Sequence, residues 1–552
     1  MNASPAPLAD PALQARVDAW LAAETDEGDA GRLRSLVRAA CAHDPEAQRE
    51  LVDAFAGDLT FGTAGLRGPL GPGPNRMNSQ VVTRAAAGLA AWLTEQHPDD
   101  HGQLRVVIGH DHRHRSADFA AVSAEVLAGA GFEVIRWDRA VPTPLLASAI
   151  RRLGAAAGIM VTASHNPAPD NGYKVYLADG RQLVAPMDEQ IADRIRAVGP
   201  VTGLPRTPVA ATPPTELAEA YLTRAISQLA VTETAVRWAY TPVHGVGAPL
   251  LTTLAHRSDF PAPALVASQL NPDPDFGNLP FPNPEEPGVM DAVIAQALQV
   301  DADIALANDP DADRLGAAIP DAGGWRRLTG DEIGLLLAAD ALERGVHGTY
   351  AASLVSGTVV GDLARSHGQP YATTLTGFKW IARVPGLVFG YEEALGFCCD
   401  PGGVADKDGI TAAVALLALT ARTLAAGATV AERLAALEAQ YGPQRTSQIA
   451  LRVTDLATIT TLMRRLRGQP PGQVAETPLA CTDHSTGTAE LPPTDALEFT
   501  GGPFRVIVRP SGTEAKLKCY LQVRHPAGTP GAVADEDLRR LTAAVHSWLA
   551  DD

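Results

Sequence analysis

Apolar residues recur every three to four positions through residues 11–56, the spacing that places side chains on one face of a helix. The stripe is formed by Leu13, Val17, Trp20 and Leu21 and resumes at Leu33, Leu36 and Val37. This pattern predicts a helical N-terminal extension over residues 1–55.

A different pattern begins near residue 80, where helical stretches alternate with short apolar runs such as Leu104–Gly109 and Ala155–Thr162. Successive strand–helix–strand units produce this alternation. The passage Gly199–Pro214 contains five prolines, which is typical of a linker, and predicts a domain boundary near residue 205. We therefore expect a first α/β domain over residues 56–205.

The same alternation continues after this boundary. A strand-like run, Val236–Tyr240, opens a second α/β segment predicted over residues 206–322. Residues 330–420 again alternate helix and strand signals, which predicts a third domain over residues 323–444. The similar texture of these three segments suggests repeated domains, although no residue-level period is evident.

The C-terminal part, residues 445–552, has a different pattern and predicts a fourth domain. Its strand candidates are Gln448–Val453, Phe504–Val508 and Lys516–Val523, and an amphipathic helix follows around Leu538–Leu549. A chain of 552 residues is long enough for roughly three to five domains.

Composition narrows the classes of function. The formal net charge of -18 argues against nonspecific binding to nucleic acid or to an anionic membrane, because both require a basic surface. An anionic substrate must then be bound by local cations. The five cysteines form no C-x-x-C pair, and no apolar run reaches the ~18–20 residues that span a bilayer. We expect a cytoplasmic protein that is not embedded in a membrane.

Residues 309–314 read Asp-Pro-Asp-Ala-Asp-Arg and directly follow the apolar run Ile304–Ala307. Alternate positions of an extended segment point to the same side, so the three carboxylates can converge on one hard cation. These are Asp309, Asp311 and Asp313, with Arg314 next in line as a counter-charge. A solvated acidic turn is an equally good explanation of this pattern alone.

A second loop, Thr162–Pro167, places Ser164 beside His165. A serine hydroxyl becomes a useful nucleophile when a base removes its proton or when it already carries the group to be transferred. Lys174 follows ten positions later and can act in acid–base chemistry if burial or a neighbouring cation lowers its pKa. Alternatively, the Ser-His-Asn sequence forms a turn or a helix cap, and Lys174 is solvated.

Two further loops suit sugar phosphates. Arg509–Glu514 follows a strand-like run and offers a guanidinium, two hydroxyls and a glycine to a phosphate, although a polar turn explains it as well. Gly390–Phe397 places the paired carboxylates Glu392 and Glu393 between glycines, where they can bind sugar hydroxyls or form a solvated turn.

Taken in order, these loops resemble the α-D-phosphohexomutase family, whose members move a phosphoryl group between two positions of a sugar. Its phosphoserine, metal, sugar and phosphate loops come from four successive domains, in the order in which Ser164, Asp309, Glu392 and Arg509 occur here. Phe61–Gly68 also resembles the arginine loop of the family's first domain. The likeness covers roughly residues 55–525. It implies a four-domain α/β architecture, with three similar α/β domains with mixed sheets and a C-terminal α+β domain around a central cleft.

The resemblance also implies roles for single residues. Phosphorylated Ser164 and the three aspartates are expected to bind one Mg²⁺. The expected catalytic residues are Ser164, His165, Lys174, Arg67 and Arg314, with Lys174 as the candidate general base. The expected substrate-binding residues are Phe378, Lys379, Glu392, Ala394, Arg509, Ser511, Gly512 and Thr513.

Within the family, the loops at Thr376–Trp380 and Asp406–Gly409 look most like the phosphoglucomutase-2 branch, which includes phosphoglucomutases and phosphopentomutases. The implied activity is a Mg²⁺-dependent phosphoglucomutase that uses glucose 1,6-bisphosphate as activator and intermediate. Mannose and pentose phosphates remain alternative substrates, because Ala394 replaces the serine common in the sugar loop of phosphoglucomutases. A sugar phosphatase and a noncatalytic sugar-phosphate sensor are further alternatives. We expect a small-molecule phosphosugar as partner and a monomer or homodimer.

Overall fold

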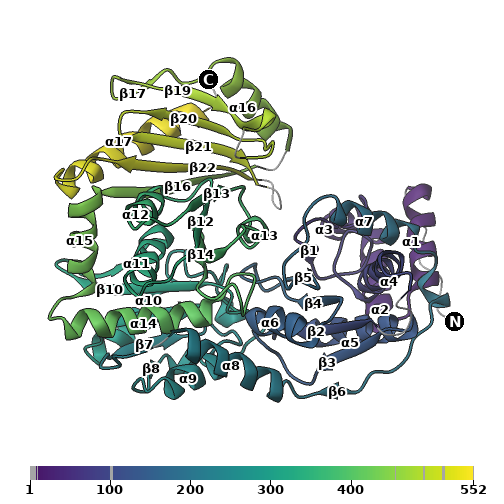
Figure 1. Cartoon of the computed structure of the whole chain (residues 1–552). Helices are drawn as coiled ribbons and strands as arrows, with labels where there is room; N and C mark the ends of the chain where they lie inside the picture. The colour runs from purple at the N-terminus through teal and green to yellow at the C-terminus, as the bar shows by residue number, and fades with distance from the viewer. Residues whose placement is uncertain are drawn as a thin grey trace.

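Four sheets of four to six strands follow one another along the chain in the computed structural model, which describes residues 8, 10–99, 104–229, 231–453, 456–488, 491–511 and 516–550. Figure 1 shows the N-terminal domain, drawn in purple and blue, at one end of the arrangement and the yellow C-terminal domain at the other. The second and third sheets lie between them.

Three short helices form the segment that precedes the first sheet: α1 (Pro11–Ala23), α2 (Glu27–Cys41) and α3 (Pro45–Ala54). Each begins after an aspartate whose carboxylate accepts two backbone N–H groups, and proline opens α1 and α3. Both features stabilise a helix N-terminus. Four residues of the predicted apolar stripe are buried and the other three are half-buried against the same core. The rings of Trp20 and Phe55 meet edge to face at 6.2 Å. These helices share one core with the first sheet.

The first sheet is mixed, with the order β1-β5-β4-β2-β3-β6. Its strands are β1 (Leu66–Pro69), β2 (Arg105–His110), β3 (Glu133–Trp137), β4 (Ala157–Val161), β5 (Asp170–Leu177) and β6 (Ala211–Thr212). The helices α4 (Ser79–Gln96), α5 (Ser116–Gly129), α6 (Thr143–Leu153) and α7 (Met187–Ala197) accompany it. β4 is buried along its whole length, as its continuous apolar run predicts.

The proline-rich passage at 199–214 differs from the linker expected there. Its residues 201–203 form a 3₁₀ turn, and β6 adds to the edge of the first sheet by pairing in parallel with β3. The predicted boundary near residue 205 thus precedes the last strand of this sheet. Helix α8 (Thr215–Leu229) then leads to the second sheet.

The second sheet has the order β11-β10-β9-β7-β8, and the third has the order β13-β12-β14-β15. Both combine parallel pairs with an antiparallel edge. The second contains β7 (Trp238–Thr241), β8 (Ala264–Leu265), β9 (Ile304–Asn308), β10 (Leu315–Asp321) and β11 (Gly324–Arg327), with α9 (Ala248–Arg257) and α10 (Asp291–Gln299). The third contains β12 (Thr349–Ser353), β13 (Tyr371–Thr374), β14 (Leu387–Glu392) and β15 (Gly396–Cys398), with α11 (Gly330–Glu343), α12 (Val359–Ser366), α13 (Phe378–Ile381), α14 (Gly409–Ala425) and α15 (Val430–Tyr441).

The C-terminal sheet is fully antiparallel, with the order β16-β22-β21-β20-β19. Its strands are β16 (Gln444–Arg452), β19 (Ala480–Asp483), β20 (Leu497–Gly501), β21 (Phe504–Pro510) and β22 (Lys516–Arg524). The helices α16 (Leu456–Gly468) and α17 (Gly531–Leu549) belong to this domain, as does a small ribbon of β17 (Gln473–Val474) and β18 (Thr477–Pro478). Three α/β domains with mixed sheets and a C-terminal α+β domain confirm the expected fold class.

Two apolar clusters connect the domains. One large core runs from the first domain through the second and third, and includes Trp137, Leu306 and Leu416. A smaller cluster joins Leu354 and Val355 of the third domain to the C-terminal domain. Within the described residues, no single helix is long and apolar enough to cross a membrane, and α14 and α15 meet that test only as a pair bent by 88°.

Neighbouring positions in α3 allow a matched test of the N-terminal packing. Leu51 is 1% exposed in the shared core, whereas Val52 is 59% exposed. Leu51→Ala should destabilise the first domain by about 2–5 kcal/mol, because it leaves a cavity. Val52→Ala should change the stability by less than about 0.5 kcal/mol. Urea unfolding followed by tryptophan fluorescence measures both, and equal effects of the two substitutions would contradict this packing.

Candidate active site

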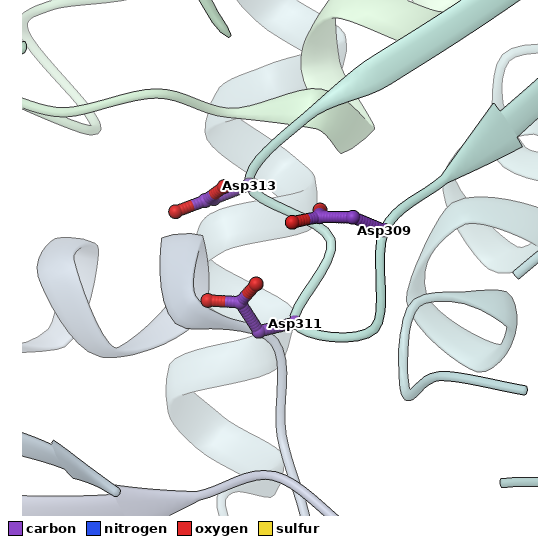
Figure 2. Close-up of side chains that lie close together, drawn as sticks. All are labelled: Asp309, Asp311 and Asp313. Carbon is purple, nitrogen blue, oxygen red and sulfur yellow. The ribbon is translucent and has the colours of Figure 1, made fainter. Parts of the chain in front are cut away.

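The three aspartates predicted to bind a metal lie in the loop between β9 and β10. All three side chains are buried, and one carboxylate oxygen of each lies within 4.8 Å of the others. Figure 2 shows the carboxylates of Asp309, Asp311 and Asp313 gathered on one side of the loop. The loop is a tight turn, because Ala312 has φ 56° and its N–H donates to the carbonyl of Asp309. Convergence therefore comes from a turn and not from an extended segment.

The contacts of these carboxylates fit a hard cation. Burial and the charges of Asp311 and Asp313 raise the pKa of Asp309 well above its ordinary value. Among the described residues, no hydrogen-bond partner is found for the buried Oδ1 atoms of Asp311 and Asp313. Buried carboxylate oxygens without partners are costly unless a cation or a proton satisfies them. Clustered carboxylate oxygens are the ligands that Mg²⁺ prefers.

Ser164 reaches this cluster from the first domain. It follows β4 in a left-handed conformation, φ 54°, and its N–H donates to Thr162 Oγ1. The Ser164 hydroxyl donates to Asp309 Oδ2 at 2.9 Å, and His165 Nδ1 lies 3.2 Å from the same hydroxyl. Two loops that are 145 residues apart in sequence thus bring the candidate nucleophile to the aspartates.

The two candidate acid–base residues differ in protonation. Burial, then the charge of Arg314, lowers the pKa of His165 well below its ordinary value, so the imidazole is neutral. Lys174 on β5 donates to Asp311 at 2.7 Å and to Asp313 at 3.1 Å. Burial alone lowers the pKa of Lys174, but these two carboxylates outweigh it and the pKa is raised. The lowered pKa that a general base at Lys174 requires is therefore not found.

Both predicted arginines lie at this site. Arg67 on β1 donates to the Asn166 side chain at 3.0 Å, within the Ser164 loop. Arg314 lies 3.9 Å from Asp309 and 3.8 Å from Asp313, and it donates to the carbonyl of Ala394 at 2.8 Å. Arg314 thereby connects the aspartate loop with the predicted sugar loop.

Sequence reasoning missed two residues that touch the aspartates. Thr143, at the start of α6, donates to Asp311 Oδ2 at 2.6 Å. Lys407 lies 3.3 Å from Asp313 and 3.5 Å from Asp406. The motif Asp406–Gly409 was visible in the sequence, but it carried no signal for a contact with a loop almost 100 residues away.

The predicted sugar loop lies beside these residues. Glu392 accepts the backbone N–H of Gly377 at 2.6 Å, and Lys379 donates to Thr63 of the first domain. Burial lowers the pKa of Lys379. The neighbouring Glu393 accepts hydrogen bonds from two serines of the third domain, and burial raises its pKa to about 7.

The structure corrects the expectation for Phe378. Its side chain is 3% exposed and packs in a core with Ala351 and Ile381. Lys407 Nζ lies 5.7 Å from the ring centroid. A ring enclosed in this way stabilises the loop by packing in the core and has little surface left for a sugar.

The predicted phosphate loop comes from the C-terminal domain. Arg509 is near the end of β21 and close enough to Lys379 for its charge to contribute to lowering the pKa of that lysine. The Ser511 N–H donates to the carbonyl of Lys516 at 2.8 Å. The other two predicted residues of this loop, Gly512 and Thr513, lie outside the described residues.

Three models of phosphoglucomutase/phosphomannomutase α/β/α domains match the chain in order. Domain I matches residues 58–200, domain II residues 219–323 and domain III residues 329–441, together more than half of the chain. The chain belongs to the phosphoglucomutase/phosphomannomutase family. The resemblance to α-D-phosphohexomutases is thereby confirmed.

Relatives of this mutase carry different substrate names. A "probable phosphomannomutase" of Haemophilus influenzae is 40% identical, covering 86% of this chain and 98% of its own. A "probable phosphoribomutase" of Schizosaccharomyces pombe is 34% identical, covering 93% and 94%. A phosphoglucomutase/phosphomannomutase family protein from Burkholderia thailandensis has the same fold, with a TM-score of 0.69, 20% identity and coverage of 89% and 98%. A human phosphopentomutase is 32% identical, covering 90% of this chain and 90% of its own. A Staphylococcus aureus phosphoglucomutase is 31% identical, covering 86% of this chain and 91% of its own.

The aspartate cluster of the mutase predicts a metal dependence. Asp311→Ala should weaken Mg²⁺ binding at least tenfold, because it removes one oxygen ligand and leaves Lys174 with less counter-charge. Isothermal titration calorimetry with Mg²⁺ measures the affinity. Asp301→Ala, on a side chain that is 89% exposed, is the control and should bind Mg²⁺ as the unaltered protein does. Equal affinity in the two variants would contradict the assignment.

Proposed function

We propose that this mutase interconverts glucose 1-phosphate and glucose 6-phosphate through a phosphoserine at position 164 and a glucose 1,6-bisphosphate intermediate. The observation that carries the proposal is the 2.9 Å contact of the Ser164 hydroxyl with Asp309, inside a buried cluster of three carboxylates. The candidate nucleophile, the three carboxylates and the basic side chains Lys174, Arg314 and Lys407 from three domains meet there. Phosphoryl transfer needs this combination of positioning and charge stabilisation.

Asp309, Asp311 and Asp313 would hold Mg²⁺ together with an oxygen on Ser164. When bound, Mg²⁺ would neutralise charge on the phosphoryl group and polarise it as a Lewis acid. Arg67 and Arg314 would face the phosphoryl oxygens with guanidinium donors, which suit such oxygens in pairs. These cations act locally in a chain whose net charge is negative.

In the transfer step, the bond between phosphorus and Ser164 Oγ breaks and a bond from phosphorus to the free sugar hydroxyl forms. The sugar hydroxyl passes its proton to an oxygen of the phosphoryl group that it receives. We assign to His165 the proton of the serine oxygen, which it accepts when Ser164 attacks the bisphosphate and returns when Ser164 is the leaving group, because its neutral imidazole lies 3.2 Å from the serine hydroxyl. Lys174, held as an ammonium group by two aspartates, is a proton donor or a fixed cation.

The phosphate that is not transferred would be bound by the C-terminal loop. Arg509, Ser511, Gly512 and Thr513 are the proposed ligands, with Lys379 facing them from the third domain. The contact of Lys379 with Thr63 places this lysine between the first and third domains. Glu392 would bind the sugar hydroxyls, and the bisphosphate would turn end for end before the phosphoryl group returns to Ser164.

Pentose phosphates are the second candidate substrate. The residue two positions after Glu392 is Ala394, so the sugar loop lacks a hydroxyl that a hexose could use. The Ala394 carbonyl is already occupied by Arg314. Proteins named phosphoribomutase and phosphopentomutase are among the relatives, as are proteins named phosphomannomutase and phosphoglucomutase. A cytoplasmic location and a monomer or homodimer stay predictions.

Replacement of the nucleophile tests the mechanism. Ser164→Ala should abolish isomerisation and remove the phosphate that mass spectrometry detects on the active-site peptide. The melting temperature should stay within a few degrees, since the change removes one oxygen. Ser227→Ala, on an exposed side chain, should behave as the unaltered enzyme does. Isomerisation by Ser164→Ala at the normal rate would exclude the phosphoserine mechanism.

A substrate panel tests the sugar. Coupled assays with glucose 1-phosphate, mannose 1-phosphate and ribose 1-phosphate should give the highest kcat/KM for the glucose ester. A tenfold preference for ribose or mannose, about 1.4 kcal/mol, would overturn that choice. Ala394→Ser should raise the ratio of glucose to ribose activity if the missing hydroxyl sets the preference. Release of inorganic phosphate without isomerisation would instead identify a phosphatase.

A further inference from the structure

Arg113 is a buried arginine next to the Ser164 loop that neither the sequence motifs nor the proposed mechanism uses. Its guanidinium donates to the carbonyls of Ser164 and Asn166, both at 2.6 Å, and to those of Pro167 at 2.8 Å and Asp170 at 3.0 Å. The arginine therefore contacts the backbone of the loop from the nucleophile to the beginning of β5. Its counter-ion Asp111 lies 3.3 Å away, and both side chains are essentially inaccessible to solvent.

This geometry suits an arginine in particular. The guanidinium is a rigid planar fork with five N–H donors, so one side chain can satisfy several carbonyls at fixed relative positions. A lysine has three donors on a single freely rotating atom and cannot reproduce the fork. Without these donors the carbonyl of Ser164, a residue in the left-handed region, would lose its hydrogen bond to Arg113. Ser164 would then be less firmly held in the conformation that directs its hydroxyl to Asp309.

The other side of Arg113 contacts the second domain. Its guanidinium lies 4.7 Å from the ring centroid of Phe276, which is 1% exposed. The neighbouring His114 lies 2.9 Å from Asp275. The same loop of the first domain thus holds the Ser164 backbone and abuts the domain that carries the aspartates. These two contacts together fix Ser164 relative to the first domain and to the second domain, which carries the aspartates.

The N-terminal helices hold this loop from a third side. Arg115, two residues beyond Arg113, has φ 66°, a conformation that is unfavourable for a residue with a side chain. Its guanidinium donates to Asp29 at 2.9 Å, to Asp26 at 2.7 Å and to Ser79 at 2.9 Å. Asp29 is 2% exposed, so this ion pair is shielded from water and is screened less by salt than a surface pair.

We propose that Arg113 is a positioning residue for the Ser164 nucleophile, and that the N-terminal helices support it through the contacts of Asp26 and Asp29 with Arg115. The functional part of this inference rests on the proposed phosphoserine mechanism. Arg113 contacts backbone atoms of the Ser164 loop and has no assigned substrate contact. Its loss should therefore slow phosphoryl transfer more than it weakens sugar binding.

The test compares Arg113→Lys, Arg113→Met and the double variant Asp26→Asn/Asp29→Asn. Asparagine also caps helices well, so the double variant removes two charges while preserving the start of α2. Hydrogen exchange of the peptide spanning residues 162–172 should become faster in all three, most in Arg113→Met. With glucose 1-phosphate, kcat per phosphorylated site should fall about 100-fold in Arg113→Met, because a misplacement of roughly 1 Å has that effect. It should fall less in Arg113→Lys and in the double variant, with KM unchanged within twofold.

Two exposed positions serve as controls. Arg139→Met removes a guanidinium that is 63% exposed, and Asp18→Asn alters an exposed carboxylate of α1. Both should leave the exchange and the kinetics unchanged. Normal exchange of the 162–172 peptide in Arg113→Lys and in the double variant would overturn the inference, as would a rise in KM without a fall in kcat. An unaltered enzyme that does not become phosphorylated at Ser164 on incubation with glucose 1,6-bisphosphate would refute the proposed mechanism instead, while the exchange measurement would still decide whether Arg113 fixes the loop.

Discussion

The neutralisation of three buried carboxylates is the interaction on which the assembly of this protein depends. Asp309, Asp311 and Asp313 belong to the second domain, but their counter-charges come from elsewhere as well: Lys174 from the first domain and Lys407 from the third. An unpaired buried charge costs several kcal/mol, so none of these domains provides a satisfactory environment for its charges alone. Burial of the cluster thus favours the arrangement in which the three domains meet, and that arrangement creates the site.

The backbone conformation of the loops also contributes to the assembly of the site. Residues with side chains and positive φ occur in the loops that meet at the aspartates: Ser164 at 54°, Ala312 at 56° and Leu395 at 61°. Each such residue costs on the order of 1–3 kcal/mol unless its surroundings hold it. The hydrogen bonds of Arg113 to the Ser164 loop and of Arg314 to the Ala394 carbonyl provide such constraints. Rigid loops of this kind keep reacting groups in place before a substrate arrives, which reduces the entropy lost on the way to the transition state.

Sequence reasoning located the loops, but it could not show how they are held together. Three aspartates at alternate positions suggested a shared ligand. Their carboxylates converge because the loop turns at Ala312, and not because the segment is extended. Each short motif alone had another explanation, and the order of the four loops carried the family resemblance. The family resemblance implied that Phe378 touches the sugar, but its ring packs in an apolar core. Thr143, Lys407 and Arg113 were not predicted, because their contacts join positions more than 50 residues apart in the sequence.

The two oxygens of Asp311 and of Asp313 differ in their contacts. At Asp311 and Asp313 the Oδ2 atoms accept from Lys174, and Thr143 adds a second donor to Asp311. Their Oδ1 atoms have no hydrogen-bond partner among the described residues. A cation can therefore bind without displacing Lys174, and the lysine fixes the orientation of the carboxylates in the meantime. The raised pKa of Lys174 has a structural reason, because the carboxylates of Asp311 and Asp313 outweigh the effect of burial. Arg314 and Lys407 add positive charge to the same cluster, near Asp309 and Asp313.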